Sequence, residues 1–389
     1  MPASPTVLSL IIMATVPSAR AEAPARNQAQ AVKIGTASPL SGPGAHQGKD
    51  IENGARMAID DLNAKGIVIG GKKVKWVLQP EDDASDPKTG AAVAQKLVDA
   101  RVAGVVGHLN SGTTVPASKI YHDAGIPQIS PAATTPQYTN QRFNTAFRVV
   151  ASDQLVGKTL ANYSVTTLKA KKIAVIDDRT AFGQGLADEF NRSVRGASLA
   201  KTGAKIVSRQ FTNDKASDFT AILTQIRSQD PDVIFYGGMD AVAGPMLKQM
   251  KALGLRAKLV SGDGICSEKL PQLAGDALGD DRVICVVAGG VSGAEEAKYN
   301  AFVERYRQRY KMPLQTYAPY AYDSVMVLAA AMQQAGSAQP AKYLSALAKV
   351  QYQGITGKIA FDPKGDLKNA ALTMYTYRQG KKIKLQVMR

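Results

Sequence analysis

The sequence predicts an α/β protein of two lobes with parallel sheets. From Val32 onward, short apolar runs alternate with segments of helical periodicity, which is the pattern of parallel sheets covered by helices. A second series of such units begins near Ser152, and 389 residues exceed what one hydrophobic core usually holds. Several of the apolar runs end in loops rich in glycine and hydroxylated residues, typical of a ligand crevice at the carboxyl ends of strands.

The first series begins with a helix whose apolar residues, from Ile51 to Leu62, repeat at helical spacing. Gly66 follows as a helix-ending glycine. Then come an expected strand at 74–78, a helix at about 87–102, a strand at 102–106, a helix at about 115–123 and a strand at 126–129.

The second series contains three expected strands, and each leads into a loop with glycines. These strands are at 173–176, 233–236 and 258–260. Helices are expected afterwards at about 294–311, 319–335 and 341–350, with β-like segments around 359 and at 372–377.

Two loops of the first series carry the clearest functional signal. Residues 107–114 read Gly-His-Leu-Asn-Ser-Gly-Thr-Thr and residues 130–136 read Ser-Pro-Ala-Ala-Thr-Thr-Pro, each after a predicted strand. Small residues leave backbone N–H groups uncovered, and hydroxyls beside a helix N-terminus favour an anion. The two loops therefore predict a site for a ligand carboxylate.

These loops resemble the ligand loops of the periplasmic leucine/isoleucine/valine-binding proteins of bacterial ABC transporters. The resemblance extends from about Val32 to Gln386 and includes the motifs at 34–42 and 361–366. It implies the type I periplasmic binding protein fold, in which two Rossmann-like lobes are joined by a three-crossover hinge. It places lobe 1 at residues 24–151 plus 287–360 and lobe 2 at residues 152–286 plus 361–389.

The resemblance also implies a set of ligand contacts. Ser111 and Thr134 match the residues that hold the carboxylate, with Ala132 and Ala133 beside them, and the Ala132 carbonyl accepts from the ligand ammonium. Asp263 matches the acidic partner of the ammonium on the other lobe, and Phe182 matches an aromatic that packs over the ligand. Without the family, these residues read as helix caps, a turn aspartate and a core phenylalanine.

The chain departs from the leucine-binding relatives at two pocket positions. Gln47 and Met239 stand where the relatives carry aromatic residues, and Ser85 and Asn110 replace a first-lobe disulfide. Tyr317 and Tyr320 are weaker candidates for pocket walls. The α-amino-acid clamp is retained while the side-chain pocket is altered, so the expected ligand is an aliphatic α-amino acid, branched-chain or otherwise.

Residues 1–23 are expected to form a signal peptide. An apolar run at 7–16 is too short to span a bilayer and is followed by small residues up to Ala21 and Ala23. The first six residues lack the usual positive charge, and a moderately apolar tail is the alternative. We therefore expect an exported, periplasmic, monomeric protein that meets the membrane only through permease subunits.

The charged residues, histidines and cysteines indicate which other partners and sites to expect. The net charge of +16 raises nucleic acid as a partner, but the charges are scattered over helix faces and no DNA-binding motif is present, so we expect none. The three histidines share no metal-ligand spacing, so no metal is expected. Cys266 and Cys285 are two small core residues in a reducing compartment, or a disulfide in an oxidising one, and the bridge is favoured.

No complete catalytic or cofactor motif is present, so an enzyme is not expected. The glycine loops are too short for a dinucleotide fingerprint, and there is no phosphate-binding loop or nucleophile elbow. His108 near Ser111 is the one suggestive pair, and His108 is interpreted as a packed histidine. The alternatives to a transport protein are a ligand-sensing regulator on the same bilobal fold and a binder of a different small amide or carboxylate.

Overall fold

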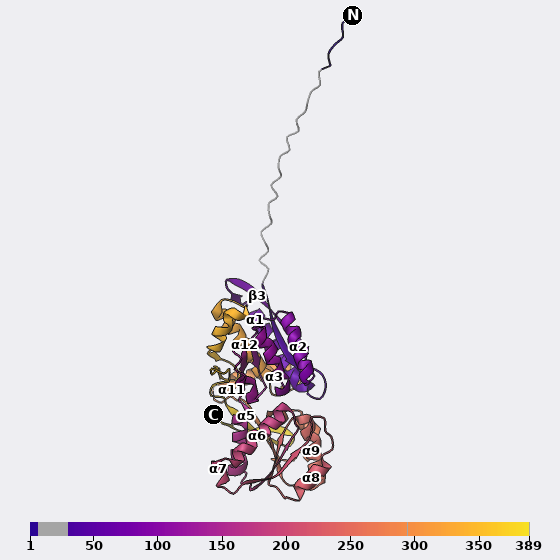
Figure 1. Cartoon of the computed structure of the whole chain (residues 1–389), viewed down its shortest axis with the longest axis vertical. Coiled ribbons are helices and arrows are strands. Elements are labelled where there is room, and N and C mark those ends of the chain that lie inside the picture. Colours follow the sequence, from indigo (N-terminus) through magenta and orange to yellow (C-terminus); the bar gives the residue numbers. More distant parts are fainter. Residues whose placement is uncertain (7–29, 294, 389) are drawn as a thin grey trace.

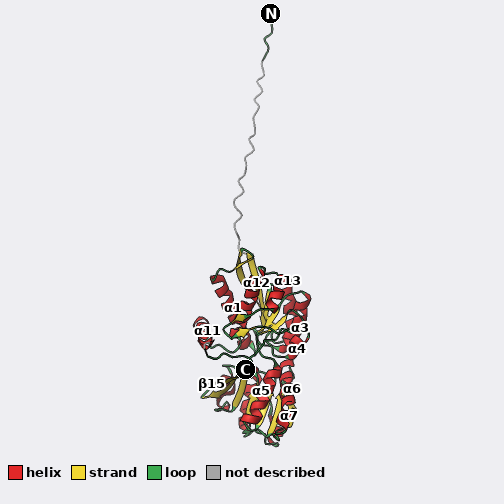
Figure 2. Ribbon diagram, turned by 90° about the vertical axis from the view of Figure 1, so that its left-hand side faces the viewer, coloured by secondary structure: helices red, strands yellow, loops and turns green. Residues whose placement is uncertain are grey.

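The computed structural model describes residues 1–6, 30–293 and 295–388 of the chain and shows two lobes (Figure 1). Each lobe contains a main β-sheet with helices packed against it (Figure 2). The predicted class, α/β with parallel sheets in two lobes, is confirmed. The signal-peptide prediction falls mainly on residues outside the described ones.

The first lobe contains a six-stranded sheet in the order β2-β3-β1-β4-β5-β6. The strands are β1 (Gln30–Ser38), β2 (Val68–Ile69), β3 (Lys72–Asp82), β4 (Gly104–Gly107), β5 (Gln128–Ser130) and β6 (Ala146–Arg148). All neighbouring pairs are parallel except β2 and β3. Every residue of β4, β5 and β6 is buried, as expected for a parallel sheet covered on both faces.

Helices from two distant parts of the chain cover this sheet. They are α1 (Ala45–Ala64), α2 (Pro87–Asp99), α3 (Ser111–Asp123) and α4 (Pro136–Asn140), then α11 (Glu295–Tyr310), α12 (Ala318–Ala335) and α13 (Pro340–Ala348). Helix α1 packs closely against the start of α12, because a Cβ on Gly54 would meet the backbone of Ala318. A small antiparallel pair, β12 (Tyr352–Gln353) and β13 (Lys358–Ile359), follows α13.

The second lobe contains a seven-stranded sheet in the order β15-β14-β11-β10-β9-β7-β8. The strands are β7 (Lys172–Asp177), β8 (Lys205–Phe211), β9 (Val233–Gly237), β10 (Lys258–Ser261), β11 (Val283–Val287), β14 (Leu372–Arg378) and β15 (Lys381–Met388). Strands β7 to β11 are parallel, whereas β14 and β15 are antiparallel to their neighbours.

The helices of the second lobe pack on both faces of its sheet. They are α5 (Asp153–Asn162) with the π-helix η1 (Tyr163–Thr167), α6 (Ala181–Arg195), α7 (Ala197–Ala200), α8 (Thr220–Arg227), α9 (Asp240–Ala252) and α10 (Leu270–Ala274). Two single 3₁₀ turns, η2 (Asp263–Ile265) and η3 (Gly275–Ala277), complete the lobe.

The chain passes between the lobes three times, after β6, after β11 and after β13. The first and second crossings are joined where the Ala151 N–H donates to Ala288 O, 3.0 Å away. The first and third are joined where the Arg148 N–H donates to Gly365 O, also at 3.0 Å. These bonds hold the three segments side by side as a hinge.

Some predicted element bounds were wrong. Helix α3 begins at Ser111 and not near Val115, because the small residues of the loop form its first turn: the hydroxyls of Thr113 and Thr114 donate to the Asn110 carbonyl. Helix α2 ends at Asp99, earlier than expected. Strand β3 extends beyond the expected 74–78, because residues 79–82 pair with the end of β1 and residues 72–73 pair with β2.

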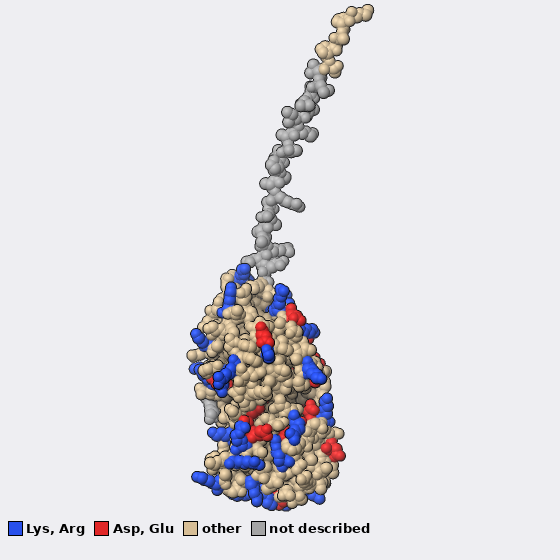
Figure 3. All heavy atoms as spheres, in the orientation of Figure 1, with Lys and Arg blue, Asp and Glu red and all other residues tan. Residues whose placement is uncertain are grey.

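Charged side chains lie over both lobes without forming a single basic tract on the face shown in Figure 3. In the described part of the chain, no helix has the length and apolar character needed to cross a membrane.

Candidate functional site

The first wall of the cleft between the lobes is the N-terminus of α3. Ser111 is the first residue of this helix, directly after β4, and is 1% exposed. Its hydroxyl oxygen has no hydrogen-bond partner among the described residues. A buried hydroxyl at the positive end of a 13-residue helix is suited to an anionic ligand group.

The second wall is the loop after β5, which carries Ala132, Ala133 and Thr134. All three are buried. The loop is shaped from inside the lobe: the Ser130 hydroxyl accepts from Ala133 N–H at 2.9 Å and donates to His108 O at 3.0 Å. Because Ser130 lies beside β4, this bond ties the Thr134 loop to the loop that carries Ser111.

Arg148 fixes the same loop from the hinge side. Its Nη1 donates to the carbonyls of Ala133 and Thr135, at 3.2 and 2.9 Å, and its Nη2 donates to Thr139 Oγ1 at 2.7 Å. Its Nε pairs with Asp366 of the third crossing. Thr134 is therefore held between two carbonyls that are bound to a buried guanidinium.

Asp263 faces these loops from the second lobe. It is the first residue of η2, directly after β10, and is 2% exposed. Its Oδ2 accepts from the Tyr317 hydroxyl of the first lobe at 3.0 Å, while Oδ1 has no partner in the described part of the chain. Burial raises the pKa of Asp263 to about 6, and the bond from Tyr317 acts in the opposite direction.

Tyr317 is held in place by a buried aspartate of α1. The carboxylate of Asp50 accepts from the backbone N–H groups of residues 315–318, including that of Tyr317 at 2.7 Å. These bonds satisfy the N–H groups of the segment that leads into α12, including that of the first helical residue, Ala318, and they hold Tyr317 beside the cleft. Of the two weaker tyrosine candidates, Tyr317 thus makes a direct contact with the acidic site residue.

Phe182 and Met239 lie together beside Asp263. A Cβ added to Gly264 would lie 2.9 Å from Phe182 Cε1 and 2.8 Å from Met239 Sδ, so both side chains contact the turn that carries Asp263. Phe182 is in the first turn of α6, which Thr180 caps by accepting from Gly183 N–H. The aromatic and thioether groups form an apolar surface next to the carboxylate.

Side chains in the first turn of α1 bond to the second lobe. Gln47 is fully buried, and its Nε2 donates to Gly264 O of the second lobe at 3.2 Å. His46 Nε2 lies 2.7 Å from Asp240 Oδ2 at the start of α9. Because the Gln47 nitrogen is bonded to the opposite lobe, only Oε1 is left without a partner among the described residues.

A cavity of about 500 Å³ opens between the lobes next to these residues. Phe182, Met239 and Asn110 line it on the inner side, and Ser41, Arg179 and Lys215 line it farther out. Ser85 and Asn110, at the positions of the family's first-lobe disulfide, are both part of its wall. This volume falls within the range of small-molecule sites.

Asp153 is a site residue that sequence reasoning missed. It begins α5 after the first crossing, is 0% exposed, and donates its N–H to Thr134 O at 2.8 Å. Burial raises the pKa of its carboxyl to about 7, and the nearby Asp263 adds to this rise. In sequence, an aspartate at a helix start reads as an ordinary first-turn residue, and nothing signals its burial.

Comparison with known proteins assigns the chain to a family. Residues 31–382 match the family model described as periplasmic binding protein. The chain is 37% identical to Leu/Ile/Val-binding protein homolog 1 of Brucella abortus, over 90% of this chain and 91% of the relative. It is 38% identical to an amino acid binding protein of Pseudomonas aeruginosa, over 89% and 90%. The chain belongs to the periplasmic binding protein family.

A solved structure of this family supports the same fold. LivJ of Streptococcus pneumoniae, a branched-chain amino acid transporter substrate-binding protein in complex with isoleucine, matches with a TM-score of 0.81 and 30% identity. The match covers 92% of this chain and 100% of LivJ. A solute-binding protein of R. palustris in complex with benzoate, 21% identical, has the same fold at a TM-score of 0.80, covering 92% and 96%.

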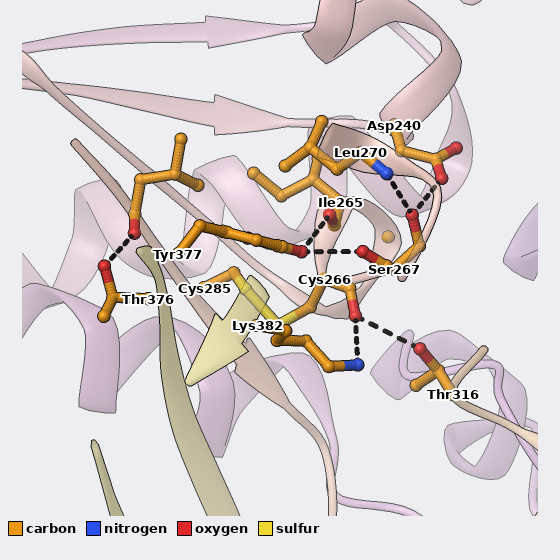
Figure 4. Close-up of a disulfide and its surroundings, with 12 residues drawn as sticks. Asp240, Ile265, Cys266, Ser267, Leu270, Cys285, Thr316, Thr376, Tyr377 and Lys382 are labelled. Carbon is orange, nitrogen blue, oxygen red and sulfur yellow. Dashed lines mark hydrogen bonds between the residues drawn. A yellow bond between two sulfur atoms is a disulfide. The ribbon is translucent and has the colours of Figure 1, made fainter. Parts of the chain in front are cut away.

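The two cysteines of this periplasmic binding protein form a disulfide. Cys266, after η2, and Cys285, in β11, have Cα atoms 5.5 Å apart (Figure 4). The Cys266 carbonyl accepts from Thr316 Oγ1 and from Lys382 Nζ, at 3.3 and 3.2 Å. Because Thr316 belongs to the first lobe, the bridged segment is also a contact across the cleft.

His108 is a packed residue, as interpreted from the sequence. It is 0% exposed, with Nδ1 2.7 Å from Asp83 Oδ2 and Nε2 3.1 Å from the Tyr121 hydroxyl. Both ring nitrogens are thus engaged inside the lobe, away from the Ser111 hydroxyl. In the described residues, no group of three or more histidine, cysteine or acidic side chains is arranged to hold a metal ion.

Proposed function

We propose that this periplasmic binding protein is the solute-binding component of an ABC importer and captures an α-amino acid between its lobes. The observation that supports the proposal is that Thr134 of the first lobe and Asp263 of the second both lie near Asp153, with Ser111 at the adjacent strand end. Ser111 and Thr134 offer donors to a carboxylate, and Asp263 offers an ammonium a buried oxygen that has no partner among the described residues. No residue is assigned a catalytic role.

The proposed contacts place the ligand carboxylate at the donors of the first lobe and the ligand ammonium at Asp263. The ligand carboxylate is held by the N–H groups of Ser111 and Thr134 and by the Thr134 hydroxyl. The ammonium lies between the Ala132 carbonyl and Asp263. The side chain packs against Phe182 and Met239, and Gln47 limits the space from the first lobe. Asp263 and Tyr317 come from different lobes, so the ammonium contact coincides with closure.

The expected affinity is micromolar. Burying an aliphatic side chain contributes about 1.5–3 kcal/mol, and charge-assisted hydrogen bonds contribute about 1.5–3 kcal/mol each. After the cost of association, a total of about −8 kcal/mol is reasonable. The cavity beyond Phe182 leaves room for side chains larger than those of the branched-chain amino acids, so the class proposed is aliphatic, branched-chain or longer.

Location and partners form part of the same proposal. Residues 1–23 serve as a signal peptide, and the mature protein is a periplasmic monomer that delivers its ligand to permease subunits. Lobe 1 consists of residues 24–151 plus 287–360, and lobe 2 of residues 152–286 plus 361–389. The two separate sheets, and β14 and β15 pairing in the second, support this division.

A thermal-shift screen of the purified protein against the twenty amino acids, small amides and carboxylates tests the function. A ligand that binds only the folded state raises the midpoint of unfolding, and at equal concentration a tighter ligand raises it more. We expect the largest shifts for aliphatic α-amino acids. A screen in which only amides or simple carboxylates shift the midpoint would overturn the amino-acid assignment.

A further inference from the structure

We propose that Asp153 is a positioning residue of the ligand site, which must carry a proton for Thr134 to bind the ligand carboxylate. This inference rests on the proposed function and extends it to the pH dependence of binding.

The side chain of Asp153 is buried beside the Thr134 loop. Both carboxyl oxygens lack a hydrogen bond of good geometry to any described residue, although the side chain is fully buried. The backbone N–H of Asp153 donates to Thr134 O, and Oδ2 would lie 3.7 Å from a Cβ on Gly185. The carboxyl therefore lies between the Thr134 loop of the first lobe and α6 of the second, near Asp263.

The charges that face Asp153 do not neutralise it. Arg148 on β6 favours the ionised form, but its guanidinium is already bonded to Asp366, to Thr139 and to the carbonyls of Ala133 and Thr135. Asp263 on η2 and Glu189 on α6 both disfavour the ionised form. Burial is the largest effect and raises the pKa to about 7.

The protonation of Asp153 depends on which group receives the proton of the Thr134 hydroxyl. A threonine hydroxyl has one proton to donate and can also accept. The Thr134 hydroxyl is close enough to Asp153 to favour the ionised carboxyl. If Thr134 instead donates its proton to the ligand carboxylate, it can only accept from Asp153. That arrangement requires a protonated carboxyl on Asp153, which also avoids two adjacent negative charges in a buried site.

Ligand binding is therefore coupled to the uptake of a proton at neutral and alkaline pH. Above the pKa of Asp153 in the free protein, about 7, the affinity falls by up to roughly tenfold per pH unit. The affinity also falls below about pH 6, because Asp263 must be ionised to bind the ammonium and its pKa is raised to about 6. We call the loss of affinity above the pKa of Asp153 the alkaline limb and this second loss the acid limb. Binding is expected to be tightest between these limits.

The experiment measures the Kd of L-leucine by calorimetry from about pH 5 to pH 8.5. Three proteins are compared: the wild type, Asp153→Asn and Asp153→Ala. The asparagine amide can donate to Thr134 as a protonated carboxyl does, so Asp153→Asn should bind near the wild-type optimum and lose only the alkaline limb. Asp153→Ala cannot orient Thr134, so it should bind roughly tenfold more weakly than the wild type does at its optimal pH, and without the carboxyl it should also lose the alkaline limb.

Asp323→Asn is the matched control, because Asp323 is also fully buried with its pKa raised to about 6 but lies on α12, bonded to residues 355 and 356. This variant should keep the alkaline limb. A wild-type affinity that is constant from about pH 6 to pH 8.5, or an alkaline limb that survives in Asp153→Asn, overturns the proposal alone. If neither L-leucine nor any other amino acid binds, the proposed function falls and this inference falls with it.

Discussion

At the scale of single residues, Asp263 determines whether the ligand must carry an ammonium group. The Asp263→Asn substitution keeps the shape and the acceptor for Tyr317 but removes the charge. We expect the affinity for an α-amino acid to weaken by about 1.5–3 kcal/mol, roughly ten- to a hundredfold. Calorimetry measures the affinity, and an unchanged Kd of the folded variant would show that Asp263 does not hold the ammonium.

The same substitution predicts a pH effect on the stability of the ligand-free protein. Because burial raises the pKa of Asp263 from 3.8 to about 6, folding favours the protonated carboxyl. The stability that this group contributes is complete below about pH 4 and is lost as the pH rises through about 6. Urea unfolding of both proteins should therefore show that the free energy of unfolding of Asp263→Asn rises relative to that of the wild type between about pH 4 and pH 7. A constant difference would contradict the buried carboxyl.

At the scale of elements, the sequence predicted the strands better than it predicted the segments after them. The apolar run before Ser111 identified β4, but small hydroxylated residues are equally common in loops and in first helical turns, and here Thr113 and Thr114 continue the helix. Asp153 gave no signal, because its burial depends on the packing of α5 against α6, which no local pattern encodes.

The first turn of α1 makes a contact between the lobes that the sequence alone does not predict. Gln47 and Gly264 are 217 residues apart, so no local pattern shows that they are bonded. Gln47→Leu removes a buried bond between the lobes, and we expect ligand release to become roughly two- to tenfold faster. Stopped-flow fluorescence measures the rate, with the exposed Gln95→Leu on α2 as a control. A release rate unaffected by Gln47→Leu would argue that this contact does not stabilise closure.

At the scale of the whole molecule, the alternation of strands and helices was enough to predict two lobes with parallel sheets. The return of the last strands to the second sheet could be predicted only from the family resemblance, since composition does not distinguish the lobes. The cleft contacts, such as that of Tyr317 with Asp263, depend on how the closed lobes meet.

The disulfide of the second lobe gives a prediction for the native protein. Protein isolated from the periplasm should contain Cys266 and Cys285 in a bridge, because that compartment is oxidising, and both should react with thiol reagents only after reduction. The mature chain should begin near Glu22 or Pro24. Mass spectrometry measures both properties. Two free thiols in native protein would contradict the bridge and leave the cleft unaffected.

In our proposal, one cleft binds both charged ends of an α-amino acid. Calorimetry of the best aliphatic amino acid, its carboxamide and its deaminated acid tests it most directly. We predict micromolar affinity for the amino acid and at least roughly tenfold weaker binding of either analogue, because each leaves a buried site group without its partner. An analogue that binds as tightly as the amino acid itself would show that the cleft does not bind both charged ends.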